Sequence, residues 1–101
     1  MALTKKQIRQ LRALAHHLNP QLSVGRNDIT DTVVKQASQS LDSHELVKCS
    51  VQDGSSLGAK EAAELLAGQI GADVVQVIGN RFTLYRRSKR DNVEHIALVR
   101  E

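Results

Sequence analysis

The side chains in this sequence that could most clearly bind a ligand are cations on one face of its first predicted helix. Four of them recur at spacings of four, three and four residues: Lys5, Arg9, Arg12 and His16. Such spacing places them along one side of a helix. No acidic residue stands among them to form the i,i+4 pairs that a solvated helix face often carries. A charge run alone is typical of a solvated helix face, but the absence of acidic residues favours a basic stripe that binds a polyanion.

Basic and acidic residues are segregated along the rest of the chain as well. Residues 1–26 hold five Lys and Arg with no acidic residue, residues 27–80 hold three basic and eight acidic residues, and residues 81–90 hold five basic residues alone. The formal net charge of +3 therefore hides two basic ends around an acidic middle. We expect the first helix, the segment 25–27 and the stretch 86–90 to lie on one contiguous polyanion-binding side.

Residues suited to catalysis or metal binding are not grouped in the sequence. Cys49 lies between valines in a strand pattern, which is typical of a buried small hydrophobe. His16 and His17 are neighbours on a helix, so their side chains diverge by roughly 100° and cannot share one metal. No phosphate-binding Walker loop or dinucleotide fingerprint occurs. We therefore expect no enzyme, no catalytic residue, no metal, no cofactor and no small-molecule substrate.

Length and composition predict a single domain over residues 1–101, in which residues 88–101 form an irregular C-terminal extension. No apolar run approaches 18 residues and no secretory signal is visible, so we expect no membrane association. The single cysteine fits a reducing cytoplasm. With one Phe, one Tyr and no Trp, the chain is poorly equipped to grip bases by stacking. These features predict a cytoplasmic monomer.

Apolar periodicity and turn residues predict the fold class. The expected elements are a helix capped at Thr4 and ending before Asn19, a strand over Gln21–Val24, a helix capped by Thr30, a strand over His44–Val51, a helix over Leu57–Ile70 that stops at Gly71, and a hairpin turning at Gly79–Asn80. This α-β-α-β-α-β-β order gives an α/β class fold, an α+β sandwich, with three helices on a mixed four-stranded sheet.

The hairpin pattern also predicts cross-strand neighbours. A tight type II′ turn at Gly79–Asn80 fixes the register of the two strands. The expected pairs are Val77 with Phe82, Val75 with Leu84, and Asp73 with Arg86. The last of these predicts an internal ion pair that partly occupies the Arg86 side chain.

The segment Gly25–Asp28 lies between a predicted strand and a helix N-terminus. Backbone amides at such a place suit a phosphate, and Gly25 would let the backbone approach it closely. The other interpretation is a plain strand-to-helix turn that helps to cap the helix.

Several segments together resemble the CRM group (chloroplast RNA splicing and ribosome maturation), and in particular its bacterial single-domain, YhbY-like members. They are Leu3–Gln7, Leu22–Asn27, His44–Lys48, Val75–Gly79 and Leu84–Arg86. The resemblance implies an RNA-binding fold like the C-terminal domain of bacterial translation initiation factor three, and association with precursors of the large ribosomal subunit. It also implies a GxxG loop like the KH-domain clamp on the nucleic-acid backbone. This sequence carries Asp28 where the second glycine would stand, and that carboxylate would repel a phosphate.

The sequence therefore predicts a non-catalytic RNA-binding protein, whose partner is RNA and, through the resemblance, ribosomal RNA in precursor large subunits. The expected RNA-binding residues are Lys5, Lys6, Arg9, Arg12, Gly25, Arg26, Asn27, Arg86, Arg87, Lys89 and Arg90. The alternative is a small protein-interaction adaptor whose basic surfaces bind acidic partners.

Overall fold

A computed structural model describes residues 3–24, 30–52, 58–88 and 96, and its elements follow the predicted order. In chain order they are α1 (Lys5–His16), β1 (Leu22–Val24), α2 (Asp31–His44), β2 (Leu46–Val51), α3 (Ala59–Ile70), β3 (Asp73–Ile78) and β4 (Arg81–Tyr85). The sheet has the order β1-β2-β4-β3, with β1 parallel to β2 and the other pairs antiparallel. The predicted fold of three helices and a mixed four-stranded sheet is confirmed.

Hydrogen bonds at the helix ends explain why these segments are helical. Thr4 and Gln7 form a capping box, in which each side chain accepts a hydrogen bond from the other's backbone N–H at 3.2 and 3.0 Å. The Thr30 hydroxyl accepts from the backbone N–H of Val33 and starts α2 in the same way. Gly71 ends α3 with a φ of 68°, a conformation that glycine adopts without strain. No helix in the described ranges is long and apolar enough to cross a membrane.

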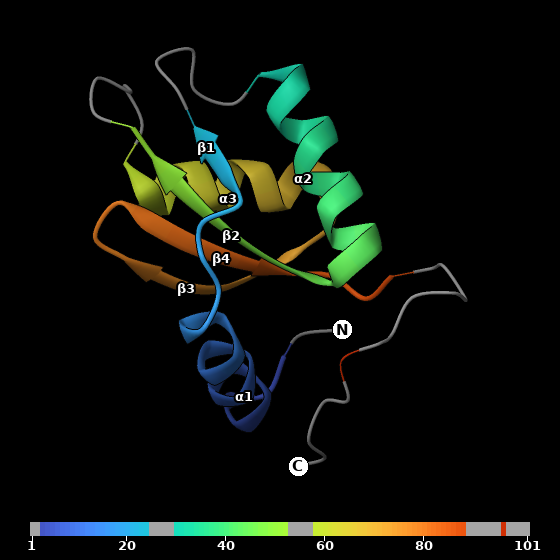
Figure 1. The fold of residues 1–101 in the computed structure, drawn as a ribbon, viewed down its shortest axis with the longest axis vertical. Helices are drawn as coiled ribbons and strands as arrows, with labels where there is room; N and C mark the ends of the chain where they lie inside the picture. The colour runs from blue at the N-terminus through green and yellow to red at the C-terminus, as the bar shows by residue number, and fades with distance from the viewer. Residues whose placement is uncertain (1–2, 25–29, 53–57, 89–95, 97–101) are drawn as a thin grey trace.

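The two faces of the sheet carry two separate apolar clusters. α2 and α3 cover one face, and α1 lies on the other (Figure 1). The larger cluster, beneath α2 and α3, includes the fully buried Leu41 and Leu66 with Phe82. The smaller cluster consists of Leu11, Ala15, Leu46, Val75 and Tyr85. Most of the core therefore forms without α1.

The hairpin between β3 and β4 differs from its predicted register at one point. Gly79 has a φ of 57° and Asn80 does not have a positive φ, which is the φ pattern of a type II′ turn. Val77 lies opposite Phe82 as predicted. Leu84 lies opposite Val74, and the prediction of Val75 was wrong, because a β-bulge between Val74 and Gln76 adds a residue to β3. The bulge turns the side chain of Val75 toward α1.

The corner between α2 and β2 was also predicted imprecisely. His44 was expected to begin the second strand, but it is the last residue of α2. Glu45 follows with a left-handed φ of 64° and is completely buried. Its carboxylate accepts hydrogen bonds from the backbone N–H groups of Ser88 and Ile96, both at 2.6 Å. Glu45 therefore fixes the chain that follows β4 to this corner at two points.

Candidate nucleic-acid interface

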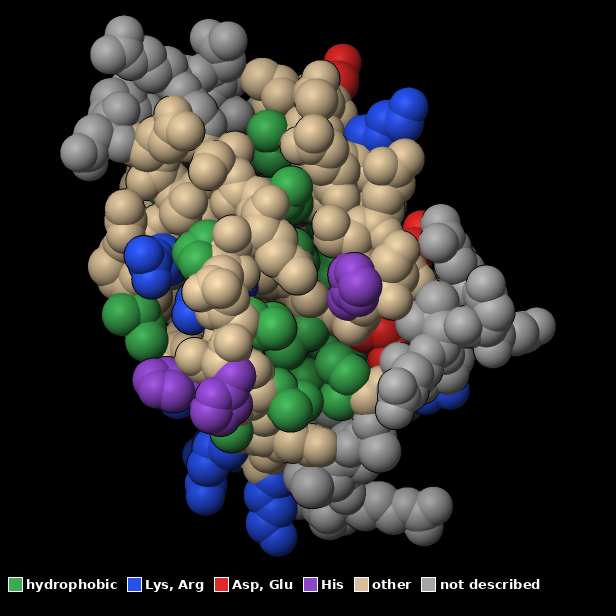
Figure 2. Space-filling view, viewed as in Figure 1, with side chains coloured by type: hydrophobic (Ala, Val, Ile, Leu, Met, Phe, Trp, Pro, Cys, Tyr) green, Lys and Arg blue, Asp and Glu red, His purple; other side chains and the backbone are tan. Residues whose placement is uncertain are grey.

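α1 rests on the sheet through a narrow apolar side and exposes its cations on the other. Leu11 and Ala15 are buried in the smaller cluster. The exposed side chains of α1 include Lys5, Lys6, Arg9, Arg12 and His16, which we call the basic stripe. Figure 2 shows Lys, Arg and His side chains gathered over α1 at the lower end of the molecule. The helix thus presents the stripe to solvent.

The first turn of α1 has an unfavourable charge for a helix. It carries Lys5 and Lys6 and no acidic residue, whereas α2 and α3 begin with Asp31 and Glu61 in their first turns. The partial positive charge at a helix N-terminus disfavours each cation by typically about 0.3–1 kcal/mol. The two lysines therefore stand where they weaken the helix, which indicates a use other than folding.

The Lys and Arg side chains of the basic stripe have no internal partner in the described part of the chain. The single ion pair found there joins Arg86 to Asp42, and neither Arg9 nor Arg12 makes a side-chain hydrogen bond to another described residue. Four cations are consequently available to a ligand along one helix.

Arg86 makes its hydrogen bonds within the protein. Its two terminal nitrogens donate to the carbonyl of Ile70 at 2.7 Å, to the carbonyl and hydroxyl of Ser38 at 2.9 and 3.1 Å, and to the Asp42 carboxylate at 2.8 Å. The expected ion pair with Asp73 was therefore wrong, because the bulge in β3 sets Asp73 opposite Tyr85. Arg86 joins α2 to the end of α3, on the face of the sheet away from α1.

Arg87, by contrast, is exposed, and its charge affects the pKa of Tyr85. Burial raises the pKa of the Tyr85 phenol and the charge of Glu45 raises it further, while the charge of Arg87 lowers it and the charge of Asp73 raises it. Tyr85 belongs to the cluster beneath α1. Arg87 is thus an exposed cation that makes no ion pair with another described residue.

The predicted loop contacts Gly25, Arg26 and Asn27 lie outside the described residues, and so do Lys89 and Arg90. The residues that flank the loop, Val24 and Thr30, stand at the end of β1 and the start of α2. In Figure 1 these ends lie at the opposite end of the long axis from α1. The expectation that the loop and the first helix share one side remains a prediction.

Lys48 on β2 fixes the end of α1 to the sheet. Its ammonium group donates to the carbonyls of Ala15 and Leu18 at 3.4 and 3.3 Å. These carbonyls lie at the C-terminal end of α1, where a cation is favoured. Sequence reasoning missed this contact, because the motif His44–Lys48 does not reveal which helix the strand faces.

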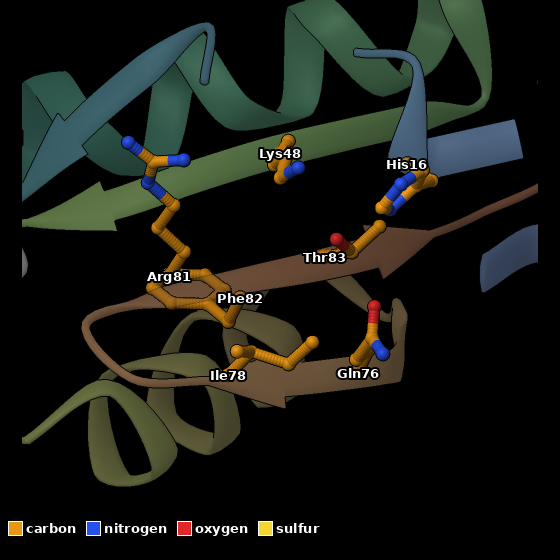
Figure 3. Close-up of a pocket in the computed structure, with 7 residues that line it drawn as sticks. All are labelled: His16, Lys48, Gln76, Ile78, Arg81, Phe82 and Thr83. Carbon is orange, nitrogen blue, oxygen red and sulfur yellow. The ribbon is translucent and has the colours of Figure 1, made fainter. Parts of the chain in front are cut away.

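α1 covers only part of its face of the sheet, and the remaining part is mainly polar, with Thr83 buried and Ile78 exposed. Paired residues share a face, and the register gives two rows: Lys48, Thr83 and Gln76, then Ser50, Arg81 and Ile78. A hollow of about 120 Å³ lies over this part. Figure 3 shows Lys48 between His16 and Arg81 in the hollow. We call these two rows the open sheet face.

Among the described residues, no three His, Cys, Asp or Glu side chains are grouped as a metal site. Cys49 is buried as predicted, and burial raises the pKa of its thiol to about 12. A thiol with that pKa is almost entirely protonated near neutral pH and is a poor nucleophile.

Comparison with known proteins gives consistent results. The sequence pattern of the CRS1/YhbY (CRM) domain matches residues 3–86. The "Probable RNA-binding protein YqeI" of Bacillus subtilis is 39% identical over 89 residues, which cover 88% of this chain and 93% of that protein. A protein of Haemophilus influenzae named RNA-binding protein is 33% identical over 92 residues, covering 91% of this chain and 93% of its own. The solution structure of a hypothetical protein from Staphylococcus aureus matches with a TM-score of 0.72 at 36% identity, covering 94% of this chain and all of that one.

Proposed function

The chain belongs to the CRS1/YhbY (CRM) domain family, and on that premise we propose that it is a non-catalytic RNA-binding protein that assists assembly of the large ribosomal subunit. The basic stripe of α1 is the primary contact in this proposal. RNA binding is supported by the names of the relatives and by the surface of α1. The ribosomal role is supported by the family resemblance drawn from the sequence motifs.

The observation that carries the proposal is the set of unpaired cations on α1. Lys5 and Lys6 occupy a helix N-terminus where cations are unfavourable, and Arg9 and Arg12 continue the row without an acidic neighbour. A bound polyanion would neutralise this row and release counterions from the RNA.

The described aromatic side chains favour backbone contacts over base stacking. Phe82 and Tyr85 are the only Phe and Tyr in the chain, and they are 1% and 5% exposed. No aromatic platform of the kind that RNA-binding sheets use to stack bases is therefore available from them. Contacts should go mainly to phosphate and ribose groups, which position an RNA without reading its sequence.

Sedimentation of a bacterial lysate through a sucrose gradient tests the proposed role. We expect the protein to travel with particles that contain precursor large-subunit RNA, and to leave those fractions after treatment with RNase. Sequencing of RNA crosslinked to the protein should then recover large-subunit ribosomal RNA.

Two other outcomes would each correct the proposal. Crosslinked RNA from other transcripts would keep RNA binding but reject the ribosomal role. An RNase-insensitive presence in the soluble top fractions alone would instead support an adaptor that binds acidic protein partners.

A further inference from the structure

The open sheet face differs in character from the part of the sheet that α1 covers. Beneath α1 the sheet contributes Leu46, Val75 and Tyr85, which are all buried. Two residues further along β2 and β4 the same face carries Lys48 opposite Thr83, and then Ser50 opposite Arg81. α1 therefore covers the apolar end of this face and leaves the polar end open.

The charge of the open sheet face is positive. No Asp or Glu lines its hollow, whereas His16, Lys48 and Arg81 all do. The Arg81 side chain is exposed and makes no hydrogen bond or ion pair to another described residue. Lys48 gives one hydrogen bond to α1 and one to Leu18 just after it, and an ammonium group has three donors, so one donor is left. Two cations can therefore reach a ligand in the hollow.

The basic stripe leads directly into this hollow. His16 is the last residue of α1 and also borders the open sheet face. From Arg9 to His16 the helix rises roughly 10 Å, and the two rows of the sheet add roughly 7 Å more. A single strand bound along α1 would thus reach the hollow at the C-terminal end of the helix.

We propose that the open sheet face is a second RNA-contact surface, which receives the ribose and phosphate of a single strand held by α1. The inference rests on the proposed RNA binding and adds a site to it. Arg81 and Lys48 contact phosphate, while the Gln76 amide hydrogen-bonds to a ribose hydroxyl. The 2′-hydroxyl is both a donor and an acceptor, and it distinguishes RNA from DNA.

The lining of the hollow combines polar side chains with one exposed apolar side chain. Ile78, which is 63% exposed, lies at its edge and supplies the apolar surface that a ribose ring can cover. The site is therefore suited to a backbone unit of RNA.

Amide chemical shifts in a titration with a uridine octamer test where the RNA lies. We expect shifts at Arg12 and His16 in α1 and at Thr83 and Arg81 in β4, with α3 unchanged. Shifts in α1 alone would overturn this inference and leave the proposed function intact. No shift in either place would contradict both.

Substitutions separate the two kinds of contact. Arg81→Gln should weaken binding of the octamer roughly fivefold near 0.1 M salt and reduce the slope of log affinity against log salt by about 0.7, because one phosphate contact is lost. The matched control is Lys60→Gln, an exposed cation on α3, which should leave both quantities unchanged. Equal effects of the two variants would contradict the proposed site.

The ribose contact has its own readout. Gln76→Leu should reduce the ratio of affinities for the uridine octamer and its deoxyuridine counterpart about threefold, because one hydrogen bond to the 2′-hydroxyl is lost. The thermal midpoint of each variant shows whether it remains folded. An unchanged ratio in a folded Gln76→Leu variant would reject the ribose contact.

Discussion

α1 and α3 have the same length of 12 residues but contrasting surfaces and cores. α3 buries five residues beneath its axis, whereas α1 buries only Leu11 and Ala15. The first turn of α3 carries an acidic residue and its cap lacks a side-chain hydrogen bond, whereas α1 has a capping box and no acidic residue in its first turn. α3 is thus favoured by burial and by its dipole, while α1 depends on its cap and on Lys48.

The contrast shows how a small domain can separate stability from binding. Since the larger apolar cluster excludes α1, the charges on α1 can be placed for a ligand at little cost to the core. Their unfavourable position at the helix N-terminus affects one weakly buried element. The following substitutions test this division.

The largest difference should appear when one fully buried leucine is removed from each helix. Leu66→Ala should lower the free energy of unfolding by about 3–4 kcal/mol, and Leu11→Ala by about 2–3 kcal/mol, because the smaller cluster can relax around the vacancy. Urea denaturation measures both. Leu11→Ala should also weaken RNA binding, since it loosens α1, whereas folded Leu66→Ala should bind normally. A larger loss of stability from Leu11→Ala would reverse the assigned roles.

Two arginines should respond in opposite ways because one is internal and the other is free. Arg86→Ala should cost about 2 kcal/mol of unfolding free energy, since it removes charge-assisted hydrogen bonds between α2 and the end of α3. Arg9→Ala should change the unfolding free energy by less than about 0.5 kcal/mol. RNA affinity should respond the other way: Arg9→Ala should weaken binding, and Arg86→Ala should leave it nearly unchanged in folded protein. If Arg86→Ala weakened binding as much as Arg9→Ala in folded protein, Arg86 would have to be counted among the RNA contacts.

Joint replacement of Arg9 and Arg12 by alanine measures the basic stripe itself. Binding of any single-stranded RNA should weaken by about 1–2 kcal/mol, and the salt slope should flatten by roughly 1.4, because two phosphate contacts are lost. Filter binding at several salt concentrations gives both values. The control pair Lys35→Ala and Lys60→Ala removes the same charge from exposed positions on α2 and α3. A similar loss in the control would mean that net charge alone attracts the RNA.

The smallest effect concerns the second residue of each helix. Lys6→Glu in α1 and Lys60→Glu in α3 place an acidic side chain at equivalent positions and should each raise the unfolding free energy by about 0.3–1 kcal/mol. Only Lys6→Glu should weaken RNA binding. Thermal melts and binding curves measure the two properties. A gain in stability together with unchanged RNA affinity for Lys6→Glu would remove Lys6 from the interface.

The parts of the structure that depend on neighbouring residues could be predicted from the sequence. Thr4, Thr30 and Gly71 act within one turn of their own helices, and Gly79–Asn80 closes its own hairpin. The spacing along α1 likewise identified the exposed cations without a structure. In these cases the residue that allows the prediction lies only a few positions from the structure that it determines.

Most of the features that the sequence did not predict involve contacts between distant segments. Arg86 reaches residues 16 to 48 positions away, and Lys48 reaches carbonyls 30 and 33 positions away. The open sheet face could be identified only from the strand order, which the sequence of helices and strands did not determine. The β3 bulge is a single extra residue, and the alternation of side chains between the two faces of the sheet continues on either side of it, so the sequence pattern does not reveal it.

The same bulge has a consequence for how the protein behaves at high concentration. In the described sheet β3 is an edge strand, and at its C-terminal end the side chains of Val77 and Ile78 are 36% and 63% exposed. A long, flat and apolar edge of this kind can recruit another chain as an additional strand and so lead to aggregates. The bulge interrupts the regular repeat of backbone donors and acceptors that such recruitment needs. β1, at the other edge, has only three residues. We therefore expect the irregularity that redirects Val75 toward α1 also to oppose edge-to-edge pairing between copies of the molecule.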